Sequence, residues 1–526
     1  MILTGQNFIG SERTGMGRNT FRAVNPATGD LLPISFYEAT EAEVGSAVLK
    51  AEAAFQEYKE QSSEDRALFL EAIGDELWAL GDELIERCMS ETALPAARLN
   101  GERMRTTNQL KMFASLVREG SWVDARIDTA IPDRQPLPRP DIRQMQVPLG
   151  PVGIFGASNF PLAFSVAGGD TASALAAGCP VVVKAHPLHP GTSEMVAQAI
   201  VSAANKTGMP DGVFSLVQGT SVEVGMAIVL HPRITAVGFT GSFRGGKALF
   251  DAANQRNTPI PVFAEMGSSN PIFLLPGAVS ARGEGLASGL VGSLNMGVGQ
   301  FCTNPGLVIA NESTETSQLL EAMGDLVSKT ASGTMLSEGI KDNYEAGVNR
   351  LTSFPGVEIV SEGISGQGKN QVPSKIFKTK ATDFLGQSGL EEEVFGPSTL
   401  SVIAEGKDQM LEVARKMQGH LTATIHGTDA DLEEYKDLIH ILERKVGRLL
   451  FNGYPTGVEV GQAMVHGGPY PATTAPQSTS VGTGAIKRFV RPVCYQDFPQ
   501  ASLPLALRDH NPLNIWRLIN GELKKK

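Results

Sequence analysis

The chain has 526 residues, more than one hydrophobic core usually organises, so we expect two or three domains. Its 42% apolar and 19% charged residues are ordinary for a globular protein and argue against a largely disordered chain. The formal net charge of −11 argues against a nucleic-acid partner, because phosphate binding needs clusters of basic residues.

The first predicted elements are a strand and three helices. The strand and its turn cover residues 21–30, where Asn-Pro and Thr-Gly-Asp supply the turn chemistry. Thr40 and Glu43 form a capping box that opens the first helix. The second helix begins near Ser62, and the third covers roughly residues 97–119. Apolar residues recur at helical spacing in the first two helices and predict faces that pack on the core.

Residues 124–147 break this pattern. Prolines at positions 132, 136, 138 and 140 exclude an ordinary helix, and residues 142–147 alternate between apolar and polar side chains. We expect an edge strand or an intersubunit strand in this segment.

Regular alternation of strand and helix begins at Gly150. Helices are predicted at residues 192–207, at 221–230 and from about residue 242. Short apolar strands are predicted at residues 152–155, 181–183, 213–217, 234–239 and 262–264. Continuous apolar strands with intervening helices indicate a parallel sheet covered on both faces, and ligands of such sheets bind at the carboxyl ends of the strands.

A second α/β unit is expected from residue 265 to about residue 455, with a strand at residues 421–426. Residues 477–493 are predicted to form a final pair of strands. Residues 513–519 are predicted to form a short amphipathic helix, docked on the body or on a partner subunit. The predicted fold class is therefore α/β.

A carboxylate and a cysteine delimit the stretch most suggestive of chemistry. Glu265 directly follows the strand at residues 262–264, at the end of an apolar element where a charge is costly. Cys302 lies among Gly297, Gly299 and Pro305, and such glycines let backbone N–H groups approach a bound oxygen. If the fold brings the two together, the cysteine can attack a carbonyl and the carboxylate can activate water. A buried apolar role is the alternative for an isolated cysteine.

Three further sites follow strand ends of the predicted parallel sheet. The turn from Phe239 through Gly241 and Ser242 to Gly246 feeds a helix N-terminus, which suits a pyrophosphate. Lys184 ends the strand at residues 181–183, where a dinucleotide ribose would lie. Asn159 follows the first strand, and its amide can donate to a developing oxyanion, although such a residue is also a common turn former.

The cysteines indicate a reducing compartment. None of the four belongs to a C-x-x-C spacing, so neither a zinc site nor a disulfide framework is expected. The first residues lack the basic start and long apolar segment of a signal peptide, and no apolar run reaches membrane-spanning length. We expect a cytoplasmic protein with no bound metal and no membrane partner.

Six motifs occur in a fixed order along the chain: Asn159-Phe-Pro161, Lys184, Phe239-Thr-Gly-Ser242, Glu265-Met-Gly267, Gly299-Gln-Phe-Cys302 and Glu393-Val-Phe395-Gly-Pro397. Together they resemble the NAD(P)-dependent aldehyde dehydrogenase superfamily over residues 25–492. The segment from Phe301 to Gly306, with Lys184-Ala-His186, is similar to one branch of it. That branch includes 2-oxoglutarate semialdehyde dehydrogenases and NADP-preferring dehydrogenases of long-chain aldehydes.

The resemblance implies a Rossmann-type cofactor domain, an α/β catalytic domain and a small β oligomerisation extension. It assigns residues 1–128 and 148–263 to the first and residues 264–475 to the second. Residues 129–147 and 476–495 would form the oligomerisation strands, and residues 496–526 a C-terminal tail. The expected assembly is a homodimer or homotetramer.

The resemblance also implies residue roles in the oxidation of an aldehyde to an acid through a cysteine thioester. Cys302 would be the nucleophile, Asn159 and the Cys302 backbone N–H the oxyanion hole, and Glu265 the general base. The cofactor, NADP or NAD, would be held by Lys184, His186, Gly241, Ser242, Gly246, Glu393 and Phe395. The substrate would contact Phe160, Phe301, Thr303 and Arg103.

Two departures from the family pattern bear on specificity. Pro187 stands where many NAD-specific members carry a glutamate that binds the 2′-hydroxyl of the adenosine ribose. We therefore expect a ribose site that has no carboxylate to repel a 2′-phosphate and in which Lys184 and His186 attract that phosphate, so that NADP is accepted or preferred. Ser158 replaces a common tryptophan before Asn159 and changes the shape of the pocket there.

The expected substrate is 2-oxoglutarate semialdehyde, whose distal carboxylate needs a cationic pocket. Arg103 and Arg105 lie on a helix that could face it, and residues 452–474, with His466, would form the opposite wall. A medium- or long-chain aldehyde dehydrogenase, a CoA-acylating dehydrogenase and a non-catalytic dinucleotide-binding protein of the same fold are the alternatives. The resemblance disfavours the last two, because both Cys302 and Glu265 are present.

Overall fold

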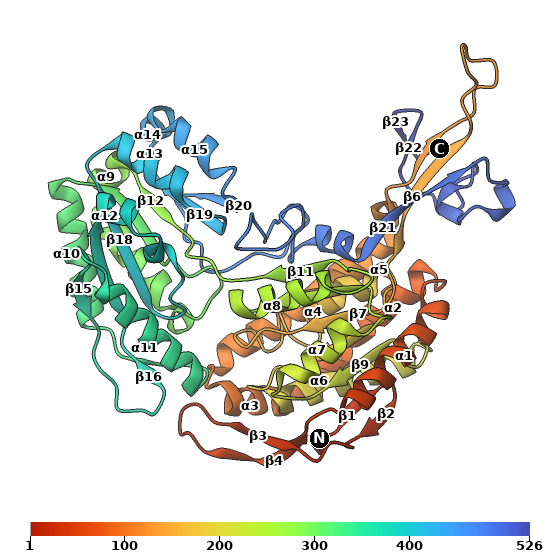
Figure 1. Ribbon diagram of the computed structural model, residues 1–526, viewed down its shortest axis with the longest axis horizontal. Helices are drawn as coiled ribbons and strands as arrows, with labels where there is room; N and C mark the ends of the chain where they lie inside the picture. Colours follow the sequence, from red (N-terminus) through yellow and green to blue (C-terminus); the bar gives the residue numbers. More distant parts are fainter. Residues whose placement is uncertain (1, 526) are drawn as a thin grey trace.

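The computed structural model describes residues 2–525. Two seven-stranded sheets and one five-stranded sheet hold most of the strands (Figure 1). In Figure 1 the first sheet and its helices lie at the lower right, the second sheet lies at the left, and the five-stranded sheet projects at the upper right. Two antiparallel pairs lie outside these sheets: β3 (Thr20–Val24) with β4 (Leu31–Tyr37), and β14 (Gly333–Thr334) with β16 (Gln371–Val372).

The first sheet runs in the order β11-β10-β7-β8-β9-β1-β2. Its parallel strands are β7 (Val152–Phe155), β8 (Val181–Lys184), β9 (Phe214–Val217), β10 (Ala236–Thr240) and β11 (Val262–Glu265). The antiparallel strands β1 (Asn7–Ile9) and β2 (Glu12–Thr14) extend one edge. The five strands that we predicted between residues 150 and 264 are therefore confirmed.

Helices cover both faces of this sheet, as its continuous apolar strands require. On one face lie α1 (Glu41–Tyr58), α7 (Val222–Leu230) and α8 (Phe243–Asn254). On the other lie α2 (Ser63–Ala79), α4 (Ala96–Glu119), α5 (Gly169–Ala177) and α6 (Pro190–Lys206), with α3 (Gly81–Thr92) against α4 and α6. The Thr40–Glu43 capping box forms as predicted and begins α1.

The second sheet runs in the order β15-β17-β18-β13-β12-β19-β20 and is parallel except for β15 (Glu358–Glu362). Its other strands are β12 (Ile272–Leu274), β13 (Leu307–Asn311), β17 (Lys375–Lys380), β18 (Ser398–Ala404), β19 (His420–His426) and β20 (Val446–Phe451). One face packs on α9 (Pro276–Asn295) and α10 (Thr314–Ser328). The other packs on α11 (Glu338–Ser353), α12 (Ala381–Gly386), α13 (Lys407–Lys416) and α15 (Lys436–Leu442), and α14 (Asp429–Glu434) contacts α9.

Only residues 266–271 separate β11 of the first sheet from β12 of the second. Glu265, the last residue of β11, therefore lies where the chain passes from one sheet to the other (Figure 1). Ligands of parallel sheets bind at the carboxyl ends of the strands, so this junction is the place to look for a site.

The third sheet runs in the order β21-β6-β5-β22-β23. Its strands are β5 (Arg126–Asp128), β6 (Ile142–Pro148), β21 (Val490–Gln496), β22 (Arg517–Ile519) and β23 (Glu522–Lys524). The predicted strand at residues 142–147 is present, but it lies inside the sheet, between β21 and β5, and not at its edge.

Two predictions near the C-terminus are wrong. Residues 477–493 contain the 3-10 helix η4 (Thr483–Phe489) and only the first part of one strand, β21, whose partner is β6. Residues 513–519 end in β22 and form no helix. The reason is the following dipeptide: Asn520 and Gly521 have φ angles of 50° and 85°, the left-handed pair that closes a tight hairpin between β22 and β23.

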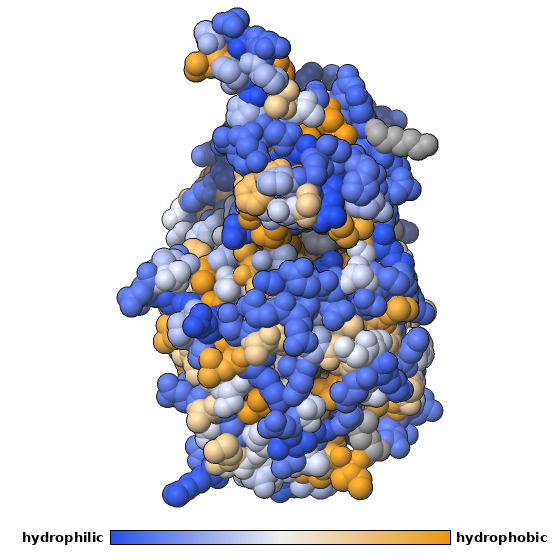
Figure 2. Space-filling model, turned by 90° about the vertical axis from the view of Figure 1, so that its right-hand side faces the viewer, coloured by the Kyte–Doolittle hydropathy of each residue, from blue (hydrophilic) through white to orange (hydrophobic). Residues whose placement is uncertain are grey.

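Figure 2 shows this side of the molecule, where apolar surface gathers beneath the projecting tip among hydrophilic residues. The exposed large apolar side chains of the five-stranded sheet and the C-terminal residues are Ile131, Leu137, Phe498, Leu505, Leu513, Trp516 and Leu523. Among residues 2–525 no helix has the length and apolarity needed to cross a bilayer. The domain boundaries stay predictions, because membership of a sheet does not establish a folding unit.

Candidate active site

Three chemically reactive side chains meet at the junction of the two sheets. Glu265 ends β11, Cys302 lies in the loop between the 3-10 helix η2 (Met296–Gly299) and β13, and His466 lies in the loop after β20. The Nε2 atom of His466 is 2.8 Å from Oε1 of Glu265 and 3.4 Å from Sγ of Cys302. One atom from each residue lies within 4.8 Å of the other two. The structure thus brings together the carboxylate and the thiol that we selected from the sequence.

Burial and charge act in opposite directions on Glu265. Burial raises its pKa, but the charge and hydrogen bond of His466 and the hydroxyl of Ser480 outweigh burial and hold the pKa below its usual value. The Ser480 hydroxyl donates to Oε2 of Glu265. The carboxylate is therefore ionised at neutral pH and can accept a proton.

The Cys302 thiol lies in an environment that disfavours its anion. Burial raises the pKa of Cys302 well above its usual value, the negative charge of Glu265 raises it further, and Arg105 acts in the opposite direction. At rest Cys302 is therefore a thiol, and a neighbouring base must remove its proton before it attacks a carbonyl.

Close backbone packing fixes the loop that carries Cys302. Gly299 has a φ of 64°, and a Cβ atom there would lie 2.3 Å from the carbonyl carbon of Gly396. The amide of Asn270 donates to the backbone oxygens of Cys302 and Asn304 at 2.8 and 2.9 Å. The amide of Asn304 donates to the Gly396 oxygen at 3.1 Å. The cysteine loop is thereby held against both the β11–β12 connection and the Gly396 loop.

Helix α4 positions the loop of Asn159. Arg98 donates to the backbone oxygen of Asn159 at 2.6 Å, and the Glu102 carboxylate accepts from the N–H groups of Leu162 and Ala163 at 2.8 and 2.9 Å. The buried Asn159 amide donates to the backbone oxygen of Gln300 at 2.9 Å. This bond places Asn159 beside the residues that precede Cys302, and leaves its second N–H for another acceptor.

Aromatic rings form a wall next to this loop. The ring of Phe160 meets those of Phe164 and Phe301 edge to face at 5.1 and 5.2 Å. The guanidinium of Arg98 lies 4.7 Å from the Phe301 ring. Thr303 is buried, and its hydroxyl has no hydrogen-bond partner among the described residues. Phe160, Phe301 and Thr303 thus lie in or beside the cysteine loop.

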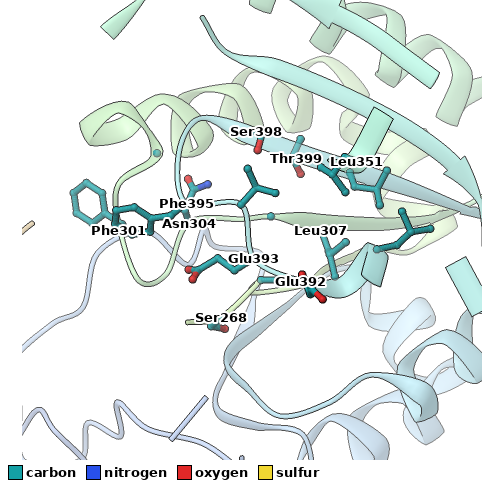
Figure 3. Close-up of a pocket in the computed structure, with 16 residues that line it drawn as sticks. Ser268, Phe301, Asn304, Leu307, Leu351, Glu392, Glu393, Phe395, Ser398 and Thr399 are labelled. Atoms are coloured by element: carbon teal, nitrogen blue, oxygen red, sulfur yellow. The ribbon is translucent and has the colours of Figure 1, made fainter. Parts of the chain in front are cut away.

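Glu393 lies on the loop that precedes β18, and Figure 3 shows it beside Ser268, with Phe301 and Asn304 of the cysteine loop on the same pocket. Burial raises the pKa of Glu393 to about 7, and a hydrogen bond from the Ser268 backbone opposes this. Phe395 lines the same pocket. A carboxylate with a single backbone donor has free acceptor capacity for the hydroxyls of a ligand.

The features that a dinucleotide needs lie along one edge of the first sheet. Ser242 caps the exposed N-terminus of α8, its hydroxyl accepting from Gly245 N at 3.2 Å, and Gly241 N donates to the Glu265 backbone oxygen at 3.1 Å. A hollow lined by Phe243 of α8 shares Ser268 and Glu393 with the pocket of Figure 3. The residues present therefore fit an extended cofactor, with its pyrophosphate at α8 and its reactive end near Cys302.

Lys184 ends β8 and donates to the Gly219 backbone oxygen. Burial lowers the pKa of Lys184 to about 8, and the nearby Glu38 carboxylate opposes this shift. Glu38 itself accepts from Ser221 N at 2.8 Å. The expectation of a ribose site without a carboxylate is therefore wrong, because Glu38 arrives from the β4–α1 connection and not from the position of Pro187.

His186 and Gly246 are placed differently from what the sequence led us to expect. Burial lowers the pKa of His186 well below its usual value, so its ring is neutral and adds no attraction for a phosphate. It stacks on His189 at 5.3 Å. Gly246 is buried, and a Cβ atom there would lie 2.7 Å from Cγ of Met266. Its place is against β11, where it lets α8 pack closely on the sheet, and not at the open helix end.

Arg103 does not reach the site. It donates to the oxygens of Gly81 and Asn100 at 2.7 and 2.9 Å, and its guanidinium lies 4.4 Å from the Trp78 ring. Residues 103 and 105 are about 200° apart around a helix, so only one of the two can face the site. The prediction for Arg103 is wrong because it selected the wrong side of α4.

Sequence reasoning missed the roles of His466, Ser480 and Asn270. His466 had been placed only in a substrate wall, although its ring touches both Cys302 and Glu265. The signal was weak, because His466 is 164 residues from Cys302 along the chain. Asn270 offered one clue, since asparagine is among the few residues that tolerate the left-handed φ of 45° found there.

Comparisons with known proteins agree with this geometry. The aldehyde dehydrogenase family model matches residues 13–469. Alpha-ketoglutaric semialdehyde dehydrogenase 2 of Azospirillum brasilense is 52% identical over 99% of this chain and 100% of the relative. Alpha-ketoglutaric semialdehyde dehydrogenase of Acinetobacter baylyi is 46% identical over 99% of this chain and 98% of the relative.

Among solved structures, betaine aldehyde dehydrogenase of Staphylococcus aureus in complex with NAD+ superimposes with a TM-score of 0.80. The match covers 94% of this chain and 96% of the other at 20% sequence identity, and it shows the fold. Motif order, site geometry, family match and fold agree, and the chain belongs to the aldehyde dehydrogenase family.

Proposed function

We propose that the protein oxidises 2-oxoglutarate semialdehyde (2,5-dioxopentanoate) to 2-oxoglutarate with NAD or NADP. The choice of substrate rests on the full-length similarity, at 52% and 46% identity, to two enzymes named for this aldehyde. The clustered thiol, imidazole and carboxylate support the chemistry. No feature of the site favours a long-chain aldehyde instead.

Acylation begins with removal of the thiol proton of Cys302. The imidazole of His466 lies 3.4 Å from Sγ, so it can take this proton, and the Glu265 carboxylate, 2.8 Å from the same ring, stabilises the imidazolium that forms. The thiolate then bonds to the aldehyde carbon, whose oxygen becomes an oxyanion. The second N–H of the Asn159 amide and the backbone N–H of Cys302 are the donors for that oxyanion.

When bound, a nicotinamide cofactor would supply the acceptor for the hydride of the aldehyde carbon. Cys302 then carries the acyl group as a thioester. Glu265 takes a proton from water, the hydroxide adds to the thioester carbon, and the carbon–sulfur bond breaks to release the acid. The Ser480 hydroxyl holds the Glu265 carboxylate in place during this step.

Three groups of this chain would hold the cofactor. The N-terminus of α8 at Ser242 suits the pyrophosphate, Lys184 the adenosine ribose and Glu393 the nicotinamide ribose. Glu38 beside Lys184 would repel a 2′-phosphate, which removes the main reason to expect a preference for NADP.

The substrate assignment is tested by steady-state kinetics on the purified protein with both cofactors. We expect kcat/KM for 2-oxoglutarate semialdehyde to exceed that for decanal by about 100-fold or more, because a site built for polar groups discriminates strongly against ligands that lack them. A rate constant for decanal equal to or above that for the dioxo acid would overturn the assignment.

We also propose that the protein forms a homo-oligomer and is located in the cytoplasm. The outer edges of β21 and β23 and the exposed apolar side chains of the five-stranded sheet support a homo-oligomer, because such surfaces favour association with a second copy. All four cysteines are free, and a mechanism based on a free thiol suits the reducing cytoplasm.

A further inference from the structure

Arg105 is a cation near the reactive thiol that has no assigned partner. Its Nε and Nη2 atoms are buried and make no hydrogen bond among the described residues. Its guanidinium lies 5.1 Å from the ring of Phe164, and that ring is 6.4 Å from the ring of His466. Arg105 therefore lies on the Cys302 side of α4 with unused donors.

The spacing along α4 explains this placement. Arg98, Glu102 and Arg105 follow an i, i+4, i+7 pattern and share one face of the helix. Arg98 and Glu102 use that face to hold the Asn159 loop. The third member of the row thus points toward the same site, whereas Arg103 lies on the other side against Trp78.

The neighbouring anions do not neutralise Arg105 by contact. Glu265 is engaged by His466 and Ser480, and Glu102 accepts from the loop backbone. Glu459, the third carboxylate near Arg105, accepts from Val460 N and forms no ion pair with Arg105 among the described residues. Arg448, the other guanidinium near the thiol, donates its Nη atoms to the backbone oxygens of Gly457 and Pro455 at 3.0 and 2.6 Å. Arg448 leaves only its Nε unused, whereas Arg105 leaves both Nε and Nη2 without an acceptor among the described residues.

An unpaired guanidinium with buried donors is costly, because its N–H groups have lost water without gaining acceptors. The cost is recovered when a ligand brings the missing anion. A carboxylate matches the planar donor fork of arginine, and charged hydrogen bonds of this kind are strong. The aldehyde end of such a ligand would then lie toward Cys302.

We propose that Arg105 binds the distal carboxylate of the substrate and thereby selects aldehydes that carry an acid group at the other end. This inference rests on the proposed oxidation of 2-oxoglutarate semialdehyde. Arg105 touches the substrate away from the reacting carbon, so it sets specificity and orientation and takes no part in proton or hydride transfer.

The test compares two five-carbon aldehydes on the same enzyme samples, 2-oxoglutarate semialdehyde and pentanal, at saturating cofactor. Pentanal has the reacting group and lacks the carboxylate. The variants are Arg105→Leu, Arg105→Lys and the matched control Arg103→Lys on the opposite side of α4. The ratio of the two kcat/KM values does not depend on the fraction of enzyme that is folded.

We expect Arg105→Leu to lower this ratio by about 30- to 100-fold, the effect of losing charged hydrogen bonds, mostly through a higher KM for the dioxo acid. Arg105→Lys should retain part of the preference, and Arg103→Lys should keep the wild-type ratio. Glutarate should compete with pentanal in the wild type and lose this effect in Arg105→Leu.

Two results would overturn the inference while leaving the proposed function intact. One is a wild-type kcat/KM on both aldehydes in Arg105→Leu. The other is an equal loss on both aldehydes, which would mean that Arg105 acts on the Cys302 thiol. A wild-type enzyme without preference for the dioxo acid over pentanal would instead overturn the proposed function, and the inference with it.

Discussion

At the scale of single residues, the charge of Glu265 controls the state of the Cys302 thiol. Burial raises the pKa of Cys302 and the Glu265 carboxylate raises it further, so the free enzyme holds a thiol at neutral pH. Only the thiolate reacts with an alkylating reagent. The reactivity of Cys302 therefore reports directly on the charge of its neighbour.

We predict that Glu265→Gln speeds alkylation of Cys302 by neutral iodoacetamide at pH 7.5, because loss of the carboxylate lowers the pKa of Cys302. In the wild type the rate should keep rising as pH rises beyond 9, since the thiol pKa lies above its usual value. Rates are measured by quenching and peptide mass spectrometry. Slower alkylation in Glu265→Gln than in the wild type would contradict the prediction.

Site residues could be identified from the sequence when the residues next to them in the chain marked them as unusual. Glu265 stood out as a charge at the end of an apolar strand, and Cys302 as a thiol among glycines. His466 and Glu38 come to the site from distant segments, so no local pattern linked them to it. Arg103 was selected wrongly for a different reason. The position of its helix was predicted, but the composition of a helix does not show which of its faces points to the site.

At the scale of elements, the parallel sheet was the most predictable part. Each of its strands from β7 to β11 is covered on both faces. Such strands consist of continuous runs of apolar residues, which can be recognised in the sequence. The C-terminal elements could not be predicted in this way. The strands β21 to β23 are half exposed, so their order depends on pairing with β5 and β6, which lie more than 300 residues earlier.

We predict that the five-stranded sheet mediates self-association. Trp516→Glu combined with Leu523→Glu places charges on two exposed apolar positions, 46% and 67% exposed in the single chain, and should shift the protein to a smaller species in analytical ultracentrifugation. Leu49→Glu, at an exposed position on α1, is the control and should leave the sedimentation unchanged. An unaltered assembly in the double variant would show that these side chains lie outside the interface.

At the scale of the whole molecule, the site depends on the short passage between the two large sheets. Glu265 ends one sheet, Cys302 precedes a strand of the other, and His466 and Ser480 come from the segment that returns along β11. The carboxylate and the thiol therefore come from different sheets. Their alignment follows from the fold and not from any single motif.

The central claim is that Cys302 carries the acyl group and Glu265 is needed to release it. The most direct measurement is intact and peptide mass spectrometry of Glu265→Gln after mixing with 2-oxoglutarate semialdehyde and NAD, quenched in acid. We predict that one acyl group accumulates on Cys302 of this variant and that Cys302→Ala acquires none. An unmodified Cys302 in Glu265→Gln, or steady turnover by Cys302→Ala, would contradict the account.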